Sequence, residues 1–180
     1  MTPSMNSSVS FEANVVNKVP DFVDPGFAIV VDTREQAPWS FQSVKCDKNV
    51  KGDVYAVRTI KDTLDPGDYS IAGHESTVSI ERKSKSDLFH CVGTDRERFE
   101  RQVQRLNELP HAFVVVEADW SSILAGDSHS ALPGKTVFRT VASWQIRYPS
   151  VHWWLCPSRG FAEKTAFRIF QRFHALKGDS

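Results

Sequence analysis

Three short apolar runs, separated by segments with helical periodicity, restrict the fold more than any other feature of the chain. The runs are FAIVVDT (27–33), HAFVVVEAD (111–119) and VHWWLC (151–156). Continuous apolar runs of this length are typical of strands buried on both faces of a sheet. Alternating apolar and polar residues predict three further strands, in VYAVRTI (54–60), YSIAG (69–73) and TVSIERK (77–83).

Apolar stripes at helical spacing predict the remaining elements. The predicted helices cover residues 86–93, 96–109, 120–126, 136–148 and 160–177. Strands early in the chain, followed by helices that alternate with strands, predict one α/β domain with a central mixed sheet flanked by helices. We assign residues 26–180 to this domain. Residues 1–25 carry Ser, Asn and Pro with weak periodicity, which predicts a flexible or loosely docked arm.

The composition excludes several classes of protein. No run approaches the roughly 18 apolar residues of a membrane-spanning helix, and the N-terminus lacks the basic and apolar regions of a secretory signal. The three cysteines are widely spaced and lie outside any CxxC pair. That spacing argues against a disulfide framework or zinc site and favours the reducing cytoplasm. The six histidines form no HxH or HxxxH pair, so imidazole is not expected to bind a metal.

Charge is balanced overall but unevenly distributed. The chain has 22 basic and 22 acidic residues, yet residues 135–177 contain eight basic residues and one acid. Such asymmetry can direct a phosphate backbone to one face of a protein. On charge alone, a solvated helical surface explains the segment equally well.

Acids stand at strand ends and turns where a buried sheet needs none. These acids are Asp32, Glu35, Asp68 and Glu81. A carboxylate at a sheet edge is costly unless it is solvated, hydrogen-bonded or bound to a cation. Carboxylates that converge repel one another, and a divalent cation relieves the repulsion. Mg²⁺ prefers one or two carboxylates together with waters and phosphate oxygens.

The stretch VSIERK adds a base to this acidic edge. Because side chains alternate along a strand, Glu81 and Lys83 share a face and Arg82 points to the other. A metal ligand beside an ammonium group suits phosphodiester hydrolysis, where charge on the phosphate must be neutralised. Taken singly, ExK can be a surface ion pair and Asp68 a turn residue. A buried strand that ends in an acid, a Gly-Asp turn and a strand that ends in ExK, in this order, indicate an active site more specifically than ExK or Asp68 alone.

Four motifs in this order resemble the nuclease domain of the XPF family of structure-specific endonucleases. They are VVDTRE (30–35), PGDY (66–69), IERKSKSDL (80–88) and RFERQVQRL (98–106). The family signature, GD followed by ERK, three residues and D, matches Gly67-Asp68, Glu81-Arg82-Lys83 and Asp87. The resemblance implies a restriction-endonuclease-like fold of the PD-(D/E)xK type. It also implies dependence on Mg²⁺, with Mn²⁺ as a substitute, and cleavage of branched DNA in repair or recombination, at 3′-flaps, forks or related junctions near single-strand/duplex boundaries.

The resemblance also implies roles for individual residues. Asp68 and Glu81 correspond to metal ligands, with Asp32 as a third, and Lys83 to the catalytic base or charge stabiliser. Glu35 would support the metal site, Arg82 would organise it and Asp87 would brace the motif. The residues expected to contact DNA are Arg34, Lys85, Arg98, Gln102, Arg105, Arg168 and Arg172.

Some of these residues have simpler interpretations. Asp87 can be a helix N-terminal acid favoured by the macrodipole, and the arginines of 98–105 can form a solvated face with acids one turn away. The aromatic residues near the C-terminus are expected to be core rather than base-stacking platforms; they are Trp153, Trp154, Phe161, Phe167, Phe170 and Phe173. A stripe of Phe167, Phe170 and His174 is an alternative homodimer contact.

The partners of the chain are a further expectation. Family enzymes usually carry a tandem helix-hairpin-helix module after the nuclease domain, and we find none in this sequence. DNA binding is then expected to use the basic C-terminal segment, a homodimer or a separate DNA-targeting protein. A catalytically silent DNA-binding or dimerisation module is the alternative, as is another enzyme of the same fold. The silent module is less favoured because Asp68, Glu81 and Lys83 are all present.

Overall fold

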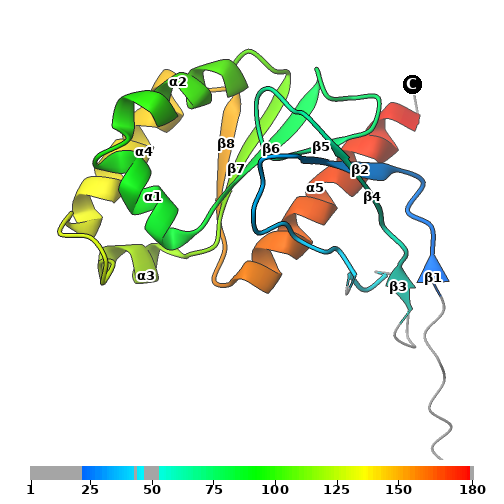
Figure 1. Cartoon of the computed structure of the whole chain (residues 1–180), viewed down its shortest axis with the longest axis horizontal. Helices are drawn as coiled ribbons and strands as arrows, with labels where there is room; N and C mark the ends of the chain where they lie inside the picture. The colour runs from blue at the N-terminus through cyan, green and yellow to red at the C-terminus, as the bar shows by residue number, and fades with distance from the viewer. Residues whose placement is uncertain (1–21, 43, 47–52, 179–180) are drawn as a thin grey trace, which may run out of the picture.

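The computed structural model describes residues 22–42, 44–46 and 53–178, and its centre is a six-stranded mixed sheet (Figure 1). The strand order is β4-β2-β5-β6-β7-β8. β2 and β4 are parallel, β5 is antiparallel to both β2 and β6, and β6, β7 and β8 are parallel. The bounds are β2 Ala28–Asp32, β4 Arg58–Asp62, β5 Tyr69–Ile71, β6 Val78–Lys83, β7 His111–Val116 and β8 Val151–Leu155.

Helices cover both faces of this sheet. Four gather on one side and a long C-terminal helix lies against the other (Figure 1). Their bounds are α1 Lys85–Val92, α2 Arg96–Leu106, α3 Trp120–Leu124, α4 Gly134–Arg147 and α5 Arg159–Gly178. The predicted α/β architecture, a central mixed sheet flanked by helices, is therefore confirmed.

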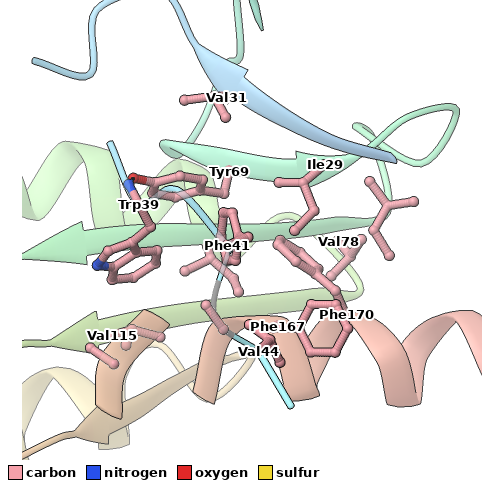
Figure 2. Close-up of a cluster of buried hydrophobic side chains, with 14 of the residues drawn as sticks. Ile29, Val31, Trp39, Phe41, Val44, Tyr69, Val78, Val115, Phe167 and Phe170 are labelled. Atoms are coloured by element: carbon pink, nitrogen blue, oxygen red, sulfur yellow. Dashed lines mark hydrogen bonds between the residues drawn. The ribbon is translucent and has the colours of Figure 1, made fainter. Parts of the chain in front are cut away.

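The core on the α5 side is rich in aromatic residues. Figure 2 shows Trp39 beside Tyr69, with Phe167 and Phe170 on the turns of α5 that face the sheet. The rings of Trp39 and Tyr69 are stacked with centroids 4.7 Å apart, and the Trp39 N–H donates to the Tyr69 hydroxyl at 2.9 Å. Burying each large apolar side chain contributes about 1.5–3 kcal/mol, so this cluster anchors α5 and the segment after β2 to the sheet.

The opposite core holds α1, α2 and α4 against β7. The predicted stripe of α2 is confirmed: Phe99, Val103 and Leu106 are fully buried. The helix ends at Leu106, three residues before the predicted end, and Leu109 still packs against the same cluster. This core fixes the position of α2 over β6, which matters for the site.

Two strand predictions need correction. Residues 54–60 form two elements in place of one strand: β3 (Val54–Tyr55) pairs with β1 in a separate two-stranded sheet, and β4 begins at Arg58 on the exposed edge of the main sheet. β8 was predicted to be buried on both faces, but it is the other edge of the sheet and exposes His152 and Trp154.

The aromatic predictions near the C-terminus are confirmed in part. Phe167, Phe170 and Phe173 are core residues, whereas Trp154 and Phe161 are 47% and 53% exposed and do not belong to it. Since Phe167 and Phe170 are fully buried, the alternative in which their stripe forms a homodimer contact is wrong.

The N-terminal arm falls mostly beyond what the structure describes. Residues 1–21 of the predicted arm lie outside the described residues. Phe22–Val23 form β1, which pairs in parallel with β3. Within the described ranges, no helix is both long and apolar enough to cross a membrane.

Candidate active site

Strand alternation brings the predicted acids to one face of the sheet. Ile29 and Val31 of β2, and Val78 and Ile80 of β6, point into the α5 core, so Asp32 and Glu81 point the other way. Asp68 precedes Tyr69, which also faces α5. Because β5 lies between β2 and β6, Asp68 lies between the other two acids. Its backbone bridges them: the Asp32 N–H donates to Asp68 O at 2.8 Å, and the Asp68 N–H donates to Ile80 O at 2.9 Å.

A pocket of about 250 Å³ opens over these acids, between the turn before β5 and helix α2. We call it the acidic pocket. It is lined by Asp32, Arg34, Asp65, Pro66, Gly67, Asp68, Glu81, Lys83, Arg98, Gln102 and Arg105. Asp68, from the turn before β5, thus meets Glu81 and Lys83 of β6 in one polar cavity, and α2 supplies its outer wall.

The turn that carries Asp68 depends on a glycine. Gly67 has φ +101°, and a Cβ added there would lie 2.0 Å from Ser79 Oγ. The Ser79 hydroxyl in turn donates to Pro66 O at 2.7 Å, which ties the turn to β6. The Asp68 carboxylate accepts the backbone N–H of Arg82 at 2.7 Å. The turn therefore holds one acid at a fixed place beside Glu81.

Both carboxylate oxygens of Glu81 have partners. Glu81 is 1% exposed; one oxygen accepts from the Lys83 ammonium and the other from the Gln102 amide. The Lys83 ammonium also lies 4.8 Å from the centre of the Phe99 ring. Packing of α2 thus sets the orientation of both the acid and the base.

The electrostatics of the pocket favour a cation. Burial, and then the charge of Glu81, raise the pKa of Asp68 to about 8. Burial alone would lower the pKa of Lys83, but the charges of Glu81 and Asp68 hold it above its usual value. Asp68 therefore retains a proton at neutral pH unless another positive charge enters. A half-buried and a buried carboxylate that repel each other are the donor set that Mg²⁺ prefers, so the residues fit a divalent cation.

Asp32 lines the pocket but its carboxylate is already engaged. It accepts from the Arg34 guanidinium at 2.8 and 3.0 Å, from the Arg34 N–H at 2.7 Å and from the Leu64 N–H at 2.7 Å. Burial tends to raise the pKa of Asp32, but the hydrogen bonds from Arg34 and Leu64 outweigh burial, and the pKa lies below its usual value. Within the described ranges, no three His, Cys, Asp or Glu side chains are grouped so as to hold a metal ion. The role of Asp32 as a third ligand stays a prediction, and Asp68 and Glu81 are the two acids that the pocket offers.

The far side of β6 carries a second polar cluster. Arg82 points away from Glu81, as predicted, and donates to Glu117 at 2.7 and 3.1 Å and to Glu35 at 3.4 Å. Trp39 and Arg159 also donate to Glu117, at 2.9 and 3.0 Å. Glu35 lies here rather than in the acidic pocket. We call Glu35, Arg82, Glu117 and Arg159 the bracing network.

Sequence reasoning missed Glu117 and Arg159. Glu117 directly follows the buried apolar run of β7, as Asp32 follows the apolar residues of β2, so the reasoning that selected Asp32 also applies to Glu117. Arg159 carries no local signal; it begins α5, and its guanidinium additionally donates to Ala37 O and Pro38 O.

Other predicted residues lie outside the pocket. Helix α1 begins one residue before the predicted helix 86–93; its N-cap is Ser84, whose hydroxyl donates to the Asp87 carboxylate and accepts the Asp87 N–H. This reciprocal capping favours the helix-terminal interpretation of Asp87. Lys85 begins α1 and is likewise not a pocket residue. Arg168 and Arg172 lie on α5 and line a different groove, and Arg168 also donates to Lys45 O at 2.7 Å.

Helix α2 presents its predicted face to the pocket. Arg98, Gln102 and Arg105 all line it, whereas Arg101 points away and lies 4.0 Å from Glu97. Over residues 31–165, which include the whole pocket, the chain matches the family model of the ERCC4 domain. The chain belongs to the ERCC4 domain family. The resemblance to XPF that the four motifs predicted is thereby confirmed.

Solved structures agree with this family. XPF from Aeropyrum pernix matches with a TM-score of 0.57 and 19% identity, covering 83% of this chain and 61% of that one. XPF from the same organism in complex with DNA matches with a TM-score of 0.59 and 18% identity, covering 84% and 66%. The ERCC4 domain described here therefore spans about three fifths to two thirds of those chains. A comparison with curated proteins found no match.

Proposed function

We propose that this ERCC4 domain is an endonuclease that depends on a divalent cation and hydrolyses phosphodiester bonds in branched DNA, at flaps, forks or related junctions. The observation that carries the proposal is the half-buried Asp68 beside the buried Glu81, with Lys83 bonded to Glu81, in a pocket rimmed by arginines. Membership of a nuclease family and the likeness to an XPF that binds DNA support it.

Each group of the pocket has a place in such a reaction. Asp68 and Glu81 would hold Mg²⁺, or Mn²⁺ in its place, which when bound neutralises phosphate charge and lowers the pKa of water. Asp68 would be ionised when it holds the cation. Lys83 stays protonated beside Glu81 and can orient the attacking water or stabilise charge on the phosphate. Arg34, Arg98 and Arg105 line the opening and would position the backbone.

The decisive experiment is a panel of end-labelled flap, fork, bubble, nicked and linear DNAs incubated with Mg²⁺, Mn²⁺ or EDTA. We expect cleavage of branched substrates with either cation and none in EDTA. Glu75→Gln, on an exposed turn, is a charge-matched control for Glu81→Gln. Binding without cleavage of any substrate would support the silent module instead, and cleavage in EDTA would contradict the cation site.

We further propose that the domain self-associates through an apolar groove of about 700 Å³ between α5, β7 and β8. Trp154, Phe161 and Leu176 line it and are 47%, 53% and 72% exposed. Exposed apolar side chains that share a groove mark interaction surfaces. The β8 edge of the sheet borders the same surface, so two copies could bury both features together.

Sedimentation equilibrium tests this surface. We expect a dimer that Phe161→Glu with Leu176→Glu converts to monomer, while Ile146→Glu does not, since Ile146 is 85% exposed on α4 outside the groove. A monomer at all concentrations would contradict self-association and leave the groove to a separate protein partner.

A further inference from the structure

Three arginines line the acidic pocket, and each is ion-paired with an aspartate. Arg34 donates to Asp32 at 2.8 Å, Arg98 to Asp95 at 2.6 Å, and Arg105 Nε lies 3.3 Å from an Asp65 oxygen. The arginine side chains are 69%, 66% and 50% exposed. We call these three residues the arginine collar. Each collar charge is therefore compensated within the protein before any phosphate arrives.

The three pairs differ in how firmly they are held. Asp32 is 2% exposed and is anchored by the backbone of Leu64, so its pair with Arg34 is part of the fold. The pairs of Arg98 and Arg105 lie at the surface, with Asp95 at the N-cap of α2 and Asp65 in the turn before β5. Exposed ion pairs contribute little to stability and can exchange partners. The hydrogen bond from Arg98 lowers the pKa of Asp95, so this carboxylate remains charged at neutral pH.

The spacing of the two exchangeable arginines suits a backbone rather than one phosphate. Arg98 and Arg105 are two turns apart on α2, which corresponds to about 10 Å at 1.5 Å per residue. This separation is larger than a single phosphate group, so the two arginines match different phosphates of one strand. A single phosphate could displace only one of the two aspartates.

We propose that Asp65 and Asp95 occupy the phosphate positions of the collar in the free protein and are displaced from Arg105 and Arg98 by a continuous sugar-phosphate backbone. This inference rests on the proposed DNA-cleaving function. The two aspartates lower the affinity for every polyanion, because each pair must open before the arginine contacts phosphate. The penalty grows with the number of pairs that a ligand opens: one pair for a single phosphate, and two for a backbone that engages both arginines.

The test measures binding in EDTA, where cleavage does not interfere, by fluorescence anisotropy of a labelled fork and a labelled dinucleotide at several salt concentrations. The variants are Asp65→Asn, Asp95→Asn and their combination. Asn retains the N-cap preference of Asp, and thermal melting checks each fold. Glu97→Gln is the control: it removes the same charge from α2, but Glu97 is 95% exposed and does not line the pocket.

We expect each Asn variant to tighten fork binding about 3- to 10-fold. The salt dependence of binding should steepen by up to about one charge. In the unaltered protein the displaced aspartate takes up a cation from solution, which offsets one of the cations released from DNA, and Asn takes up none. Glu97→Gln should change the dissociation constant less than twofold, and Asp65→Glu and Asp95→Glu should bind like the unaltered protein. The fork, which opens both pairs, should gain more from the double variant than from either single variant, whereas the dinucleotide should not.

Two results separate failure of this inference from failure of the proposed function. If the unaltered protein cleaves branched DNA but the Asn variants behave like Glu97→Gln, or bind more weakly, the role of the two aspartates is refuted and the nuclease stands. If the unaltered protein neither binds nor cleaves any branched DNA, the proposed function fails and this inference fails with it.

Discussion

The backbone N–H of Arg82 donates a 2.7 Å hydrogen bond to the Asp68 carboxylate, while the side chain of the same residue bonds Glu117 on the opposite face of the sheet. One residue thus ties the acidic pocket to the bracing network. The arrangement explains why a base follows Glu81 on β6: its side chain does not face the pocket, but it fixes the strand from which Glu81 and Lys83 project.

Loss of the Glu81 carboxylate should remove cleavage without unfolding the domain. Glu81→Gln is nearly isosteric and keeps a partner for Gln102, so the fold should survive. We expect cleavage of forked DNA to fall at least about 100-fold, the order typical of a lost catalytic group. DNA binding in EDTA should be unchanged or tighter, because a negative charge that faces phosphate is gone. Unaltered cleavage in the purified variant would remove Glu81 from the mechanism.

The raised pKa of Asp68 predicts an unusual pH dependence of stability. The folded protein retains a proton on Asp68 up to about pH 8, whereas the unfolded chain loses it near pH 4. Between these values the native state binds more protons, so without a cation the free energy of unfolding should fall as pH rises. Asp68→Asn removes this contribution and should gain in relative stability toward pH 9. Urea titrations of both proteins in EDTA, at pH 5 and pH 9, measure the difference; an equal change in the two would contradict the raised pKa.

Proton release should also accompany cation binding. Because Asp68 is protonated below about pH 8, a divalent cation must displace that proton, and its affinity should rise with pH and level off above this value. Calorimetric titration with Mn²⁺ in buffers of different ionisation enthalpy counts the protons released. Asp68→Asn should bind the ion more weakly and release none. A pH-independent affinity would show that Asp68 is already ionised.

The bracing network should matter to stability although it lies outside the pocket. The side chains of Arg82 and Glu117 are 10% and 9% exposed. Breaking a buried ion pair leaves an uncompensated charge and costs about 3–5 kcal/mol, so Glu117→Ala should lower the free energy of unfolding by this order. Glu97→Ala, at an exposed ion pair on α2, should cost less than about 1 kcal/mol. Equal urea midpoints for Glu117→Ala and the unaltered protein would contradict the structural role.

The turn at Gly67 allows the steric and conformational penalties to be separated. Gly67→Ala meets both a positive φ and a Cβ position 2.0 Å from Ser79 Oγ, whereas Gly73, at φ +83°, has no atom within 4 Å of its Cβ position. Gly73→Ala should therefore cost about 1 kcal/mol, and Gly67→Ala distinctly more. Removing Oγ with Ser79→Ala should recover part of the difference. If urea titrations showed the same loss in the free energy of unfolding for Gly67→Ala and Gly73→Ala, a clash between the Cβ added at position 67 and Ser79 Oγ would be excluded.

The sequence by itself determined the elements and the face on which the chemistry lies. Alternation along β6 places Glu81 and Lys83 opposite Val78 and Ile80, because side-chain direction in a strand follows from residue parity alone. The buried stripe of α2 was also predictable from the sequence, because Phe99, Val103 and Leu106 are at helical spacing and therefore share one side of the helix.

Only the tertiary structure decided which charges meet. Glu35 and Asp32 are neighbours in sequence, yet one bonds Arg82 behind the sheet and the other holds Arg34 at the pocket. Glu117 and Arg159 are joined across 42 positions, and β8 is exposed because it is an edge strand. Local periodicity carries no information on strand order or on which distant side chains share a cavity, and these long-range contacts set burial, pKa and ion pairing.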